Sequence, residues 1–220
     1  QAAPAEFEDV FEKIVVAGES AVVITLSSKL SGTWQSAMIS AREYEDSVYV
    51  VDSRSVAIGA AILAKLAMRL VDEGMGAREI AERLEKEREK ICLIAMLDTL
   101  EYLKKGGRIS AAAAFAGGVL SIKPVVCIRD GEIVILGKAR GSKQGNNLLV
   151  SEIRKTGGID FTKPILLGYT GLDDTLLQKY IEDSKALGEE GISSLETTMI
   201  GSVIGTHAGP GAVAVAFFSV

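Results

Sequence analysis

Short apolar runs alternate with amphipathic stretches along the first 97 residues. The apolar runs are rich in Val and Ile, which is typical of buried strands, and the stretches between them repeat apolar residues at helical spacing. The expected strands are 21–26, 47–51 and 91–97, and the expected helices are 33–43, 57–72 and 77–90. Because strands that alternate with helices build parallel sheets, this half predicts a parallel sheet flanked by helices.

After residue 98 the alternation gives way to a mixed order of elements. A short helix ends at Gly106-Gly107, and Asp130-Gly131 between two apolar runs predicts a β-hairpin. Further strands and helices follow, and the small-residue segment 110–120 is compatible with a closely packed helix. We therefore predict an α/β protein of two domains, 1–98 and 99–220, with a mixed α+β sheet in the second domain and a cleft between the two.

Composition and charge narrow the possible functions. The chain has 220 residues, of which 48% are hydrophobic, and its net charge of −5 argues against a nucleic-acid surface. The longest apolar segment, 109–122, is too short for a membrane span. A single histidine excludes a His-rich metal site, and we expect no cofactor. Cys92 and Cys127 lie in strand-like runs and are expected to be buried, reduced thiols of a cytoplasmic protein.

Residues 27–33 follow the first strand and precede a helix, and they contain three serines, a glycine and a threonine. Loops at this place in α/β proteins commonly bind ligands, because the amide N–H groups at a helix start attract anions. The alternative is a plain helix cap made by Ser31 or Thr33. The loop by itself leaves both interpretations open.

Three other features have a structural and a functional interpretation. His207, beside a Gly-Pro-Gly turn, is either a structural hydrogen-bonding group or part of a ligand site. Arg108 follows a helix end, where it either complements the helix dipole or binds a carboxylate or phosphate. The basic cluster 138–143 is either an ordinary solvated surface or a docking site for an anionic group or an acidic partner. The chain has no G-x-S-x-G, Walker A or complete G-x-G-x-x-G motif.

Taken together, five segments resemble the DegV family of bacterial fatty-acid-binding proteins. They occur in the family's order and together span nearly the whole chain. The segments are 27–37, 51–53, 98–110, 122–124 and 205–213.

The resemblance implies two α/β domains that clasp one long-chain fatty acid and present it to a fatty acid kinase, which makes the acyl phosphate for phospholipid metabolism. It implies that Ser31, Gly32 and His207 bind the carboxylate and that Arg108 lies near it. Ser28, expected mainly to support the turn, and Thr206 complete the predicted ligand-binding set. Arg140 and Lys138 are expected to face the kinase or its phosphate.

A buried acyl chain is consistent with the physics of transfer from water. At about 0.8 kcal/mol per CH₂, a sixteen-carbon chain contributes on the order of 10 kcal/mol before ordering costs. We expect the 110–120 segment and the 57–71 helix to line the tunnel for it.

Two further expectations follow from the sequence. Family members begin about sixty residues earlier, so we expect the first domain to lack that segment, including a threonine that the resemblance makes a carboxylate ligand.

The alternative function is an enzyme that acts on a small carboxylated or phosphorylated substrate in the cleft, with Ser31, Arg108 and His207 as anion ligands. A third alternative is an interaction domain without a ligand pocket.

Overall fold

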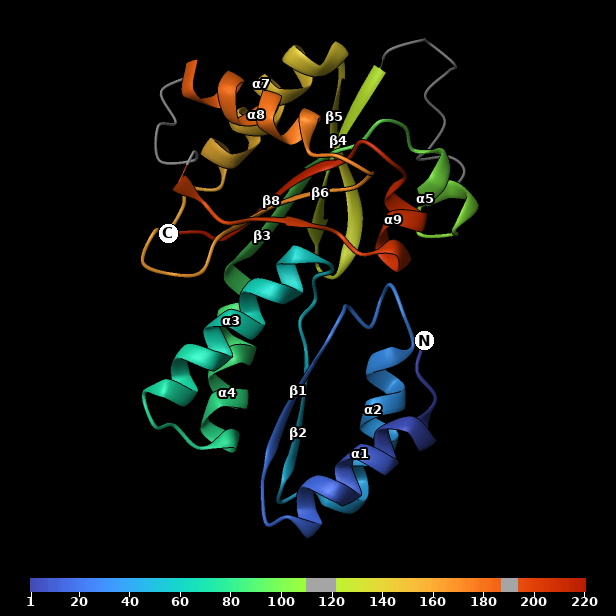
Figure 1. Ribbon diagram of the computed structural model, residues 1–220, viewed down its shortest axis with the longest axis vertical. Coiled ribbons are helices and arrows are strands. Elements are labelled where there is room, and N and C mark those ends of the chain that lie inside the picture. The colour runs from blue at the N-terminus through green and yellow to red at the C-terminus, as the bar shows by residue number, and fades with distance from the viewer. Residues whose placement is uncertain (110–121, 187–193) are drawn as a thin grey trace. The chain divides into compact units, whose positions relative to one another are not determined.

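The computed structural model describes residues 1–109, 122–186 and 194–220 (Figure 1). The chain divides into two compact units. Unit 1 contains Gln1–Ile91 together with the short segment Asp130–Glu132, and unit 2 contains Cys92–Arg129 and Ile133–Val220.

Unit 1 is a parallel β-sheet covered by helices on both faces. Its elements in order are α1 (Pro4–Val16), β1 (Ala21–Thr25), α2 (Thr33–Ala41), the 3₁₀ turn η1 (Arg42–Tyr44), β2 (Val48–Asp52), α3 (Ile58–Asp72), α4 (Ala77–Glu87) and the 3₁₀ turn η2 (Arg88–Lys90). In the described part of the chain this sheet contains β1 and β2, which pair in parallel from Ala21↔Val48 to Thr25↔Asp52.

The two faces of this sheet pack against different helices. Figure 1 shows α1 and α2 on one side of β1 and β2, and α3 and α4 on the other. Phe11 of α1 and Val48 of β2 belong to the first apolar layer, and Leu63 of α3 and Leu84 of α4 are wholly buried in the second. Burying each such side chain contributes about 1.5–3 kcal/mol, which explains why the apolar stripes of these helices face the sheet.

Unit 2 is built on a larger sheet with the strand order β5-β4-β3-β8-β6-β7 in its described part. Its elements are β3 (Ile91–Met96), α5 (Glu101–Lys105), β4 (Ile122–Arg129), β5 (Glu132–Arg140), α7 (Gly141–Lys155), β6 (Leu166–Tyr169), α8 (Thr175–Ala186), β7 (Thr197–Met199), α9 (Ser202–Ala208) and β8 (Val213–Phe218). β3 pairs with β4 and β6 with β8 antiparallel, whereas β6 pairs with β7 in parallel, so the sheet is mixed as expected.

Each face of this second sheet has its own apolar layer. On one face, Met96 and Val125 pack with Leu149 of α7 and Leu177 of α8. On the other face, the next residue along β4, Val126, packs with apolar residues from the segment that carries α5. The alternation of successive strand residues between the two layers is the period-2 pattern of a strand buried on both sides.

The structure corrects one prediction about the first sheet. The alternating pattern assigns the 91–97 run to the parallel sheet of the first domain, but β3 pairs antiparallel with β4 through Ile94↔Cys127 and lies between β4 and β8. Periodicity identifies a buried strand without identifying its partners, because pairing depends on contacts distant in sequence. The division into domains 1–98 and 99–220 stays a prediction.

The structure contains one helix that the sequence pattern missed. The pattern did not predict α9, which contains Thr206 and His207, because the glycines around it indicated a loop. The 110–120 segment, expected to form a helix along the acyl chain, lies outside the described residues. Among the described helices, none has the length and hydropathy needed to cross a membrane.

Candidate functional site

Residues 27–33, which we call the serine loop, connect β1 to α2 in unit 1. Ser27 is wholly buried, and its carbonyl oxygen accepts the amide hydrogens of Leu30 at 3.0 Å and Ser31 at 3.1 Å. Its Oγ accepts the amide hydrogen of Lys29 at 3.2 Å. One buried serine therefore folds the first half of the loop into a tight turn.

Ser31 lies at the end of the serine loop, where α2 begins. Its Oγ lies 2.9 Å from Oγ1 of Thr33 and accepts the amide hydrogen of Thr33 at 3.2 Å. The N-cap residue of α2 is Gly32, so neither Ser31 nor Thr33 is the helix cap, and the bond between Ser31 and Thr33 forms a local turn just before the helix. The next amide groups of a helix start have no intrahelical acceptor, so an anion beside Ser31 is not excluded by this contact.

Gly32 lies against the side chain of Gln1. A Cβ at this position would lie 2.7 Å from Oε1 of Gln1, and the Gln1 side chain also donates a hydrogen bond to Oγ of Ser36 at 3.3 Å. Because these atoms are at the end of the flexible Gln1 side chain, a larger residue at position 32 requires only a movement of that side chain.

Asp52, at the end of β2, shapes the same loop. Its carboxylate accepts the amide hydrogen of Ser28 at 3.2 Å and that of Arg54 at 2.8 Å. The Ser28 amide is therefore used within the protein, and the expected role of its side chain stays a prediction. The sequence places Asp52 in one of the five segments that carry the family resemblance, 51–53, and predicts no separate role for it. The register Thr25↔Asp52, which aligns the ends of β1 and β2, brings its carboxylate to the loop.

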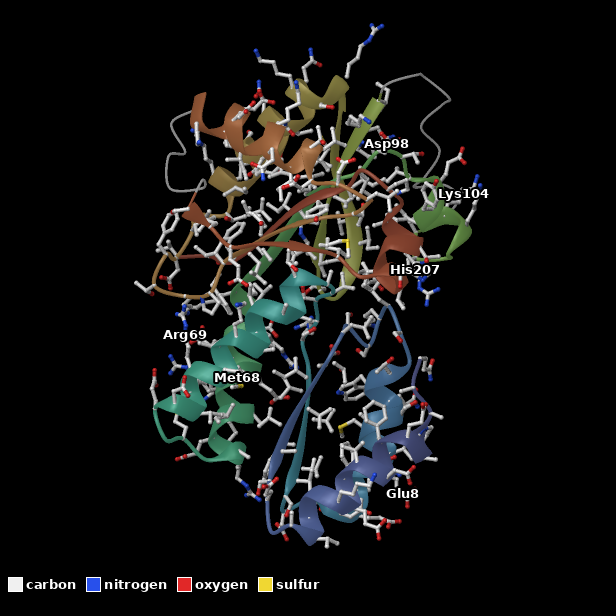
Figure 2. All side chains as sticks on the ribbon, in the orientation of Figure 1. Glu8, Met68, Arg69, Asp98, Lys104 and His207 are labelled. Carbon is white, nitrogen blue, oxygen red and sulfur yellow. The ribbon has the colours of Figure 1, made fainter. Side chains whose placement is uncertain are left out.

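His207 and Arg108 come together in unit 2, where α5 packs against α9. Figure 2 shows His207 on α9 beside α5, which carries Lys104. The imidazole Nδ1 of His207 faces the backbone of Gly106, at a place where a side chain on residue 106 would collide with the ring. This Nδ1 is buried and has no hydrogen-bond partner among the described residues. In a neutral imidazole one ring nitrogen donates and the other accepts, so Nε2 can serve as the donor when Nδ1 carries no proton.

The electrostatic surroundings keep His207 neutral. Burial of the ring and then the positive charge of Arg108 lower the pKa of His207 below its ordinary value of 6.5. Arg108 itself is exposed, and its Nη1 donates a hydrogen bond to the carbonyl oxygen of Gly106 at 2.6 Å. The pair presents a neutral imidazole beside a cation, an arrangement suited to an anionic group that has both a hydrogen-bond acceptor and a charge.

The helix end before Arg108 forms as the sequence predicts. The amide of Gly107 bonds to the carbonyl of Lys104, and the amide of Arg108 bonds to the carbonyl of Leu103 at 2.9 Å. Gly107 has a φ of +71°, the left-handed conformation that ends helices. The Gly-Gly pair thus turns the chain so that Arg108 follows the helix end directly.

Thr206 makes a local hydrogen bond within α9. It is exposed, and its Oγ1 donates to the carbonyl of Ser202, one turn earlier in α9, at 2.8 Å. Threonine often makes this bond in helices. Its place in a ligand site stays a prediction.

Thr170, which the sequence did not single out, holds the turn after α9. Its buried Oγ1 donates to the carbonyl of Gly209 at 2.5 Å and accepts the amide hydrogen of Ala212 at 2.9 Å. Backbone bonds between Thr170 and Gly211 and Ala212 complete the pairing. The only signal in the sequence is a threonine that follows a strand and precedes a glycine, which is too common to identify this role.

Lys138 and Arg140 lie two residues apart near the end of β5, and both are exposed. Residues i and i+2 of a strand point to the same face, so these two cations share a face of the sheet edge. The amide of Arg140 donates to Oε1 of Gln144 at 3.2 Å, which holds the junction between β5 and α7. The role of this pair in binding a partner stays a prediction.

Other candidate chemistry can be assigned to ordinary structure. Asp98 forms an ion pair with Lys123, and in the described residues no group of three or more His, Cys, Asp or Glu side chains could hold a metal ion. Cys92 and Cys127 are both free and partly buried, and burial raises the pKa of each thiol.

The fold defines a class of protein: in its described part the chain is an α/β protein with a parallel two-stranded sheet in one unit and a mixed six-stranded sheet in the other. The sequence model described as "Uncharacterised protein, DegV family" matches residues 1–220. The chain belongs to the DegV family.

Individual relatives agree with this assignment. A DegV domain-containing protein of Caldanaerobacter subterraneus is 35% identical over 221 residues, which cover 99% of this chain and 77% of the relative. Among solved structures, one is a DegV family protein of Thermus thermophilus that is described by its fatty acid binding. It is 29% identical with a TM-score of 0.86, and the match covers 100% of this chain and 78% of the Thermus chain. A DegV lipid-binding protein of Thermotoga maritima is 27% identical with a TM-score of 0.82. The match covers 99% of this chain and 76% of the Thermotoga chain.

Proposed function

We propose that this protein binds one long-chain fatty acid and is a carrier without enzymatic activity of its own. In this proposal Ser31, Gly32 and His207 donate hydrogen bonds to the carboxylate, and Arg108 adds a positive charge near it. The observation that carries the proposal is the similarity, over the whole chain, to a Thermus thermophilus protein described by its fatty acid binding.

The state of His207 supports a binding role over catalysis. A histidine that serves as general base is normally oriented by a partner on its second nitrogen, as in hydrolase triads. Here Nδ1 of His207 faces the Gly106 backbone and has no hydrogen-bond partner among the described residues. Its lowered pKa also makes it a weak base. A neutral imidazole with a proton on Nε2 is instead a good donor to a carboxylate.

The ligand itself can be varied to test the head-group assignment. We expect purified protein to contain fatty acid detectable by mass spectrometry and to bind oleate at least about tenfold more tightly than methyl oleate, a difference of about 1.4 kcal/mol. The ester keeps the acyl chain but lacks the anionic carboxylate. Absence of co-purified lipid together with no uptake of added oleate would reject the proposal.

Two variants connect this preference to the proposed residues. Ser31→Ala and His207→Ala should each lose most of the preference for oleate while methyl oleate affinity stays nearly the same. Ser151→Ala, an exposed serine on α7, is the matched control and should bind as the parent protein does. Unchanged oleate preference in both site variants would contradict the assignment of these two residues.

We further propose that the bound acid is presented to a fatty acid kinase through the face that carries Lys138 and Arg140. In a reaction with kinase and ATP, the double variant Lys138→Glu/Arg140→Glu should form acyl phosphate more slowly at unchanged oleate affinity. Lys179→Glu, an exposed lysine on α8, provides the control for the change of charge. Equal rates in both variants would remove Lys138 and Arg140 from the interface.

A further inference from the structure

The turn between β4 and β5 contacts the serine loop. Residues Asp130–Glu132 belong to unit 1, as the serine loop does. Ser27, wholly buried, donates a hydrogen bond from its Oγ to the carbonyl oxygen of Gly131 at 2.7 Å. The same Oγ accepts the amide hydrogen of Lys29, so one hydroxyl group connects the turn to the loop backbone.

The contact has no space for a larger residue at position 131. A Cβ there would lie 2.6 Å from Oγ of Ser27 and 3.2 Å from Cγ of Lys29. Asp130 and Gly131 have φ values of +52° and +82°, the conformation of a two-residue hairpin turn. Glycine is therefore required twice, by the turn and by the approach to Ser27.

An ion pair joins the neighbouring residue of the turn to the same region. Oδ1 of Asp130 lies 3.2 Å from Nη2 of Arg54, and Nη1 of Arg54 binds both carboxylate oxygens of Glu89 at 2.7 and 2.9 Å. The amide of Arg54 bonds in turn to Asp52, which accepts the Ser28 amide. The turn therefore contacts the serine loop directly through Ser27 and indirectly through Arg54 and Asp52.

We propose that the turn Asp130–Gly131 positions the serine loop for the carboxylate of the ligand, with Gly131 and Ser27 as positioning residues. Ser27 holds the amides of Leu30 and Ser31 with its carbonyl oxygen, and the Gly131 carbonyl fixes the side chain of Ser27. A displacement of Ser27 therefore moves Ser31 and Gly32. This inference rests on the proposed function for its ligand, but the positioning itself is a property of the free protein.

The test uses two glycines with the same backbone conformation. Gly131→Ala introduces the collision with Ser27, whereas Gly74→Ala, in the turn between α3 and α4, has a φ of +84° with nothing within 4 Å of the new Cβ. Both variants carry the same backbone strain, and Gly131→Ala should lower the unfolding temperature further because its Cβ collides with Ser27. Only Gly131→Ala and Ser27→Ala should weaken oleate binding, by about tenfold or more, while methyl oleate affinity changes less than about twofold.

Hydrogen exchange in the protein without ligand separates this inference from the proposed function. In Gly131→Ala and in Ser27→Ala the amides of Lys29 and Ser31 should exchange faster than in the parent protein, and in Gly74→Ala they should not. If these exchange rates do not change in Gly131→Ala, the positioning role is overturned, whether or not the protein binds oleate. If exchange accelerates but the parent protein binds no oleate, the positioning role is supported and the proposed ligand is wrong.

A double variant gives a second check on the contact. Because Ser27→Ala removes the hydroxyl that collides with Ala at position 131, the effects of the two substitutions should not add. The double variant should bind oleate about as well as Ser27→Ala alone. Fully additive losses would mean that the two residues act independently, which would overturn the proposed link through Ser27.

Discussion

His207 depends on neighbours that are distant in the sequence. Gly106 leaves the space into which the imidazole Nδ1 packs, and Arg108 contributes to the lowered pKa of the ring. Neither effect can be inferred from the residues that flank His207 in the chain. The same holds for Ser31, whose placement depends on Ser27 and, through it, on Gly131.

At this scale, Gly106→Ala should disturb His207 without straining the backbone. Gly106 has a φ of −75°, which alanine adopts freely, so the main penalty is the collision with the ring, beside a tight contact of 3.2 Å to the carbonyl oxygen of Tyr102. We expect oleate affinity to fall by about tenfold, or about 1.4 kcal/mol, measured by calorimetric titration. Gly201→Ala, where nothing lies within 4 Å of the new Cβ, is the control. Equal affinities in the two variants would contradict the role of His207 in binding.

Single elements were predicted well where the hydrophobic pattern is strong. The helix Ile58–Asp72 and the strands Ala21–Thr25 and Val48–Asp52 lie where periodicity indicated them, because burial of their apolar faces determines their conformation. The helix Ser202–Ala208 was missed, since its small residues and glycines carry no such pattern. Its position depends on packing against α5 and on the turn held by Thr170.

The element that Thr170 supports should be sensitive to loss of one hydroxyl. Thr170→Val keeps the shape of the side chain but leaves the Gly209 carbonyl and the Ala212 amide without their partner. We expect a loss of about 2–4 kcal/mol in the free energy of unfolding, measured by urea denaturation. Thr170→Ser should restore most of it. Thr197→Val, an exposed threonine on β7, should change stability by less than about 0.5 kcal/mol. A similar loss in both valine variants would contradict the role of the Thr170 hydroxyl.

On the scale of the whole molecule, titratable groups define the pH range of greatest stability. The pKa of His207 is lowered in the folded protein, so its contribution is complete above about pH 6.5 and is lost as the pH falls toward the lowered value. Hydrogen bonds from Thr162 and Thr175 lower the pKa values of Asp160 and Asp173, whose contributions are lost at pH values below 3.8. Burial raises the pKa values of both cysteines, whose contributions are lost as the pH rises above 9.0.

We therefore expect the free energy of unfolding to be nearly constant between about pH 6.5 and 9 and to decline on both sides. The measurement is a series of urea unfolding curves at constant ionic strength. In His207→Gln the decline that begins just below pH 6.5 should be absent, while the acidic decline below pH 3.8 remains. Identical pH profiles for the parent protein and this variant would mean that folding does not lower the pKa of His207.

The sequence by itself determined the conformation of most elements, the hairpin at Asp130-Gly131, and, through five motifs in order, the family. These properties are local or are carried by short segments, so periodicity, turn residues and motifs are sufficient to identify them. Only the tertiary structure decided that the strand Ile91–Met96 belongs to the second sheet, that Asp52 and Gly131 bond to the serine loop, and that Gly106 and Arg108 lie beside His207. Each of these contacts joins residues distant in sequence, and their pairing depends on how whole elements pack together.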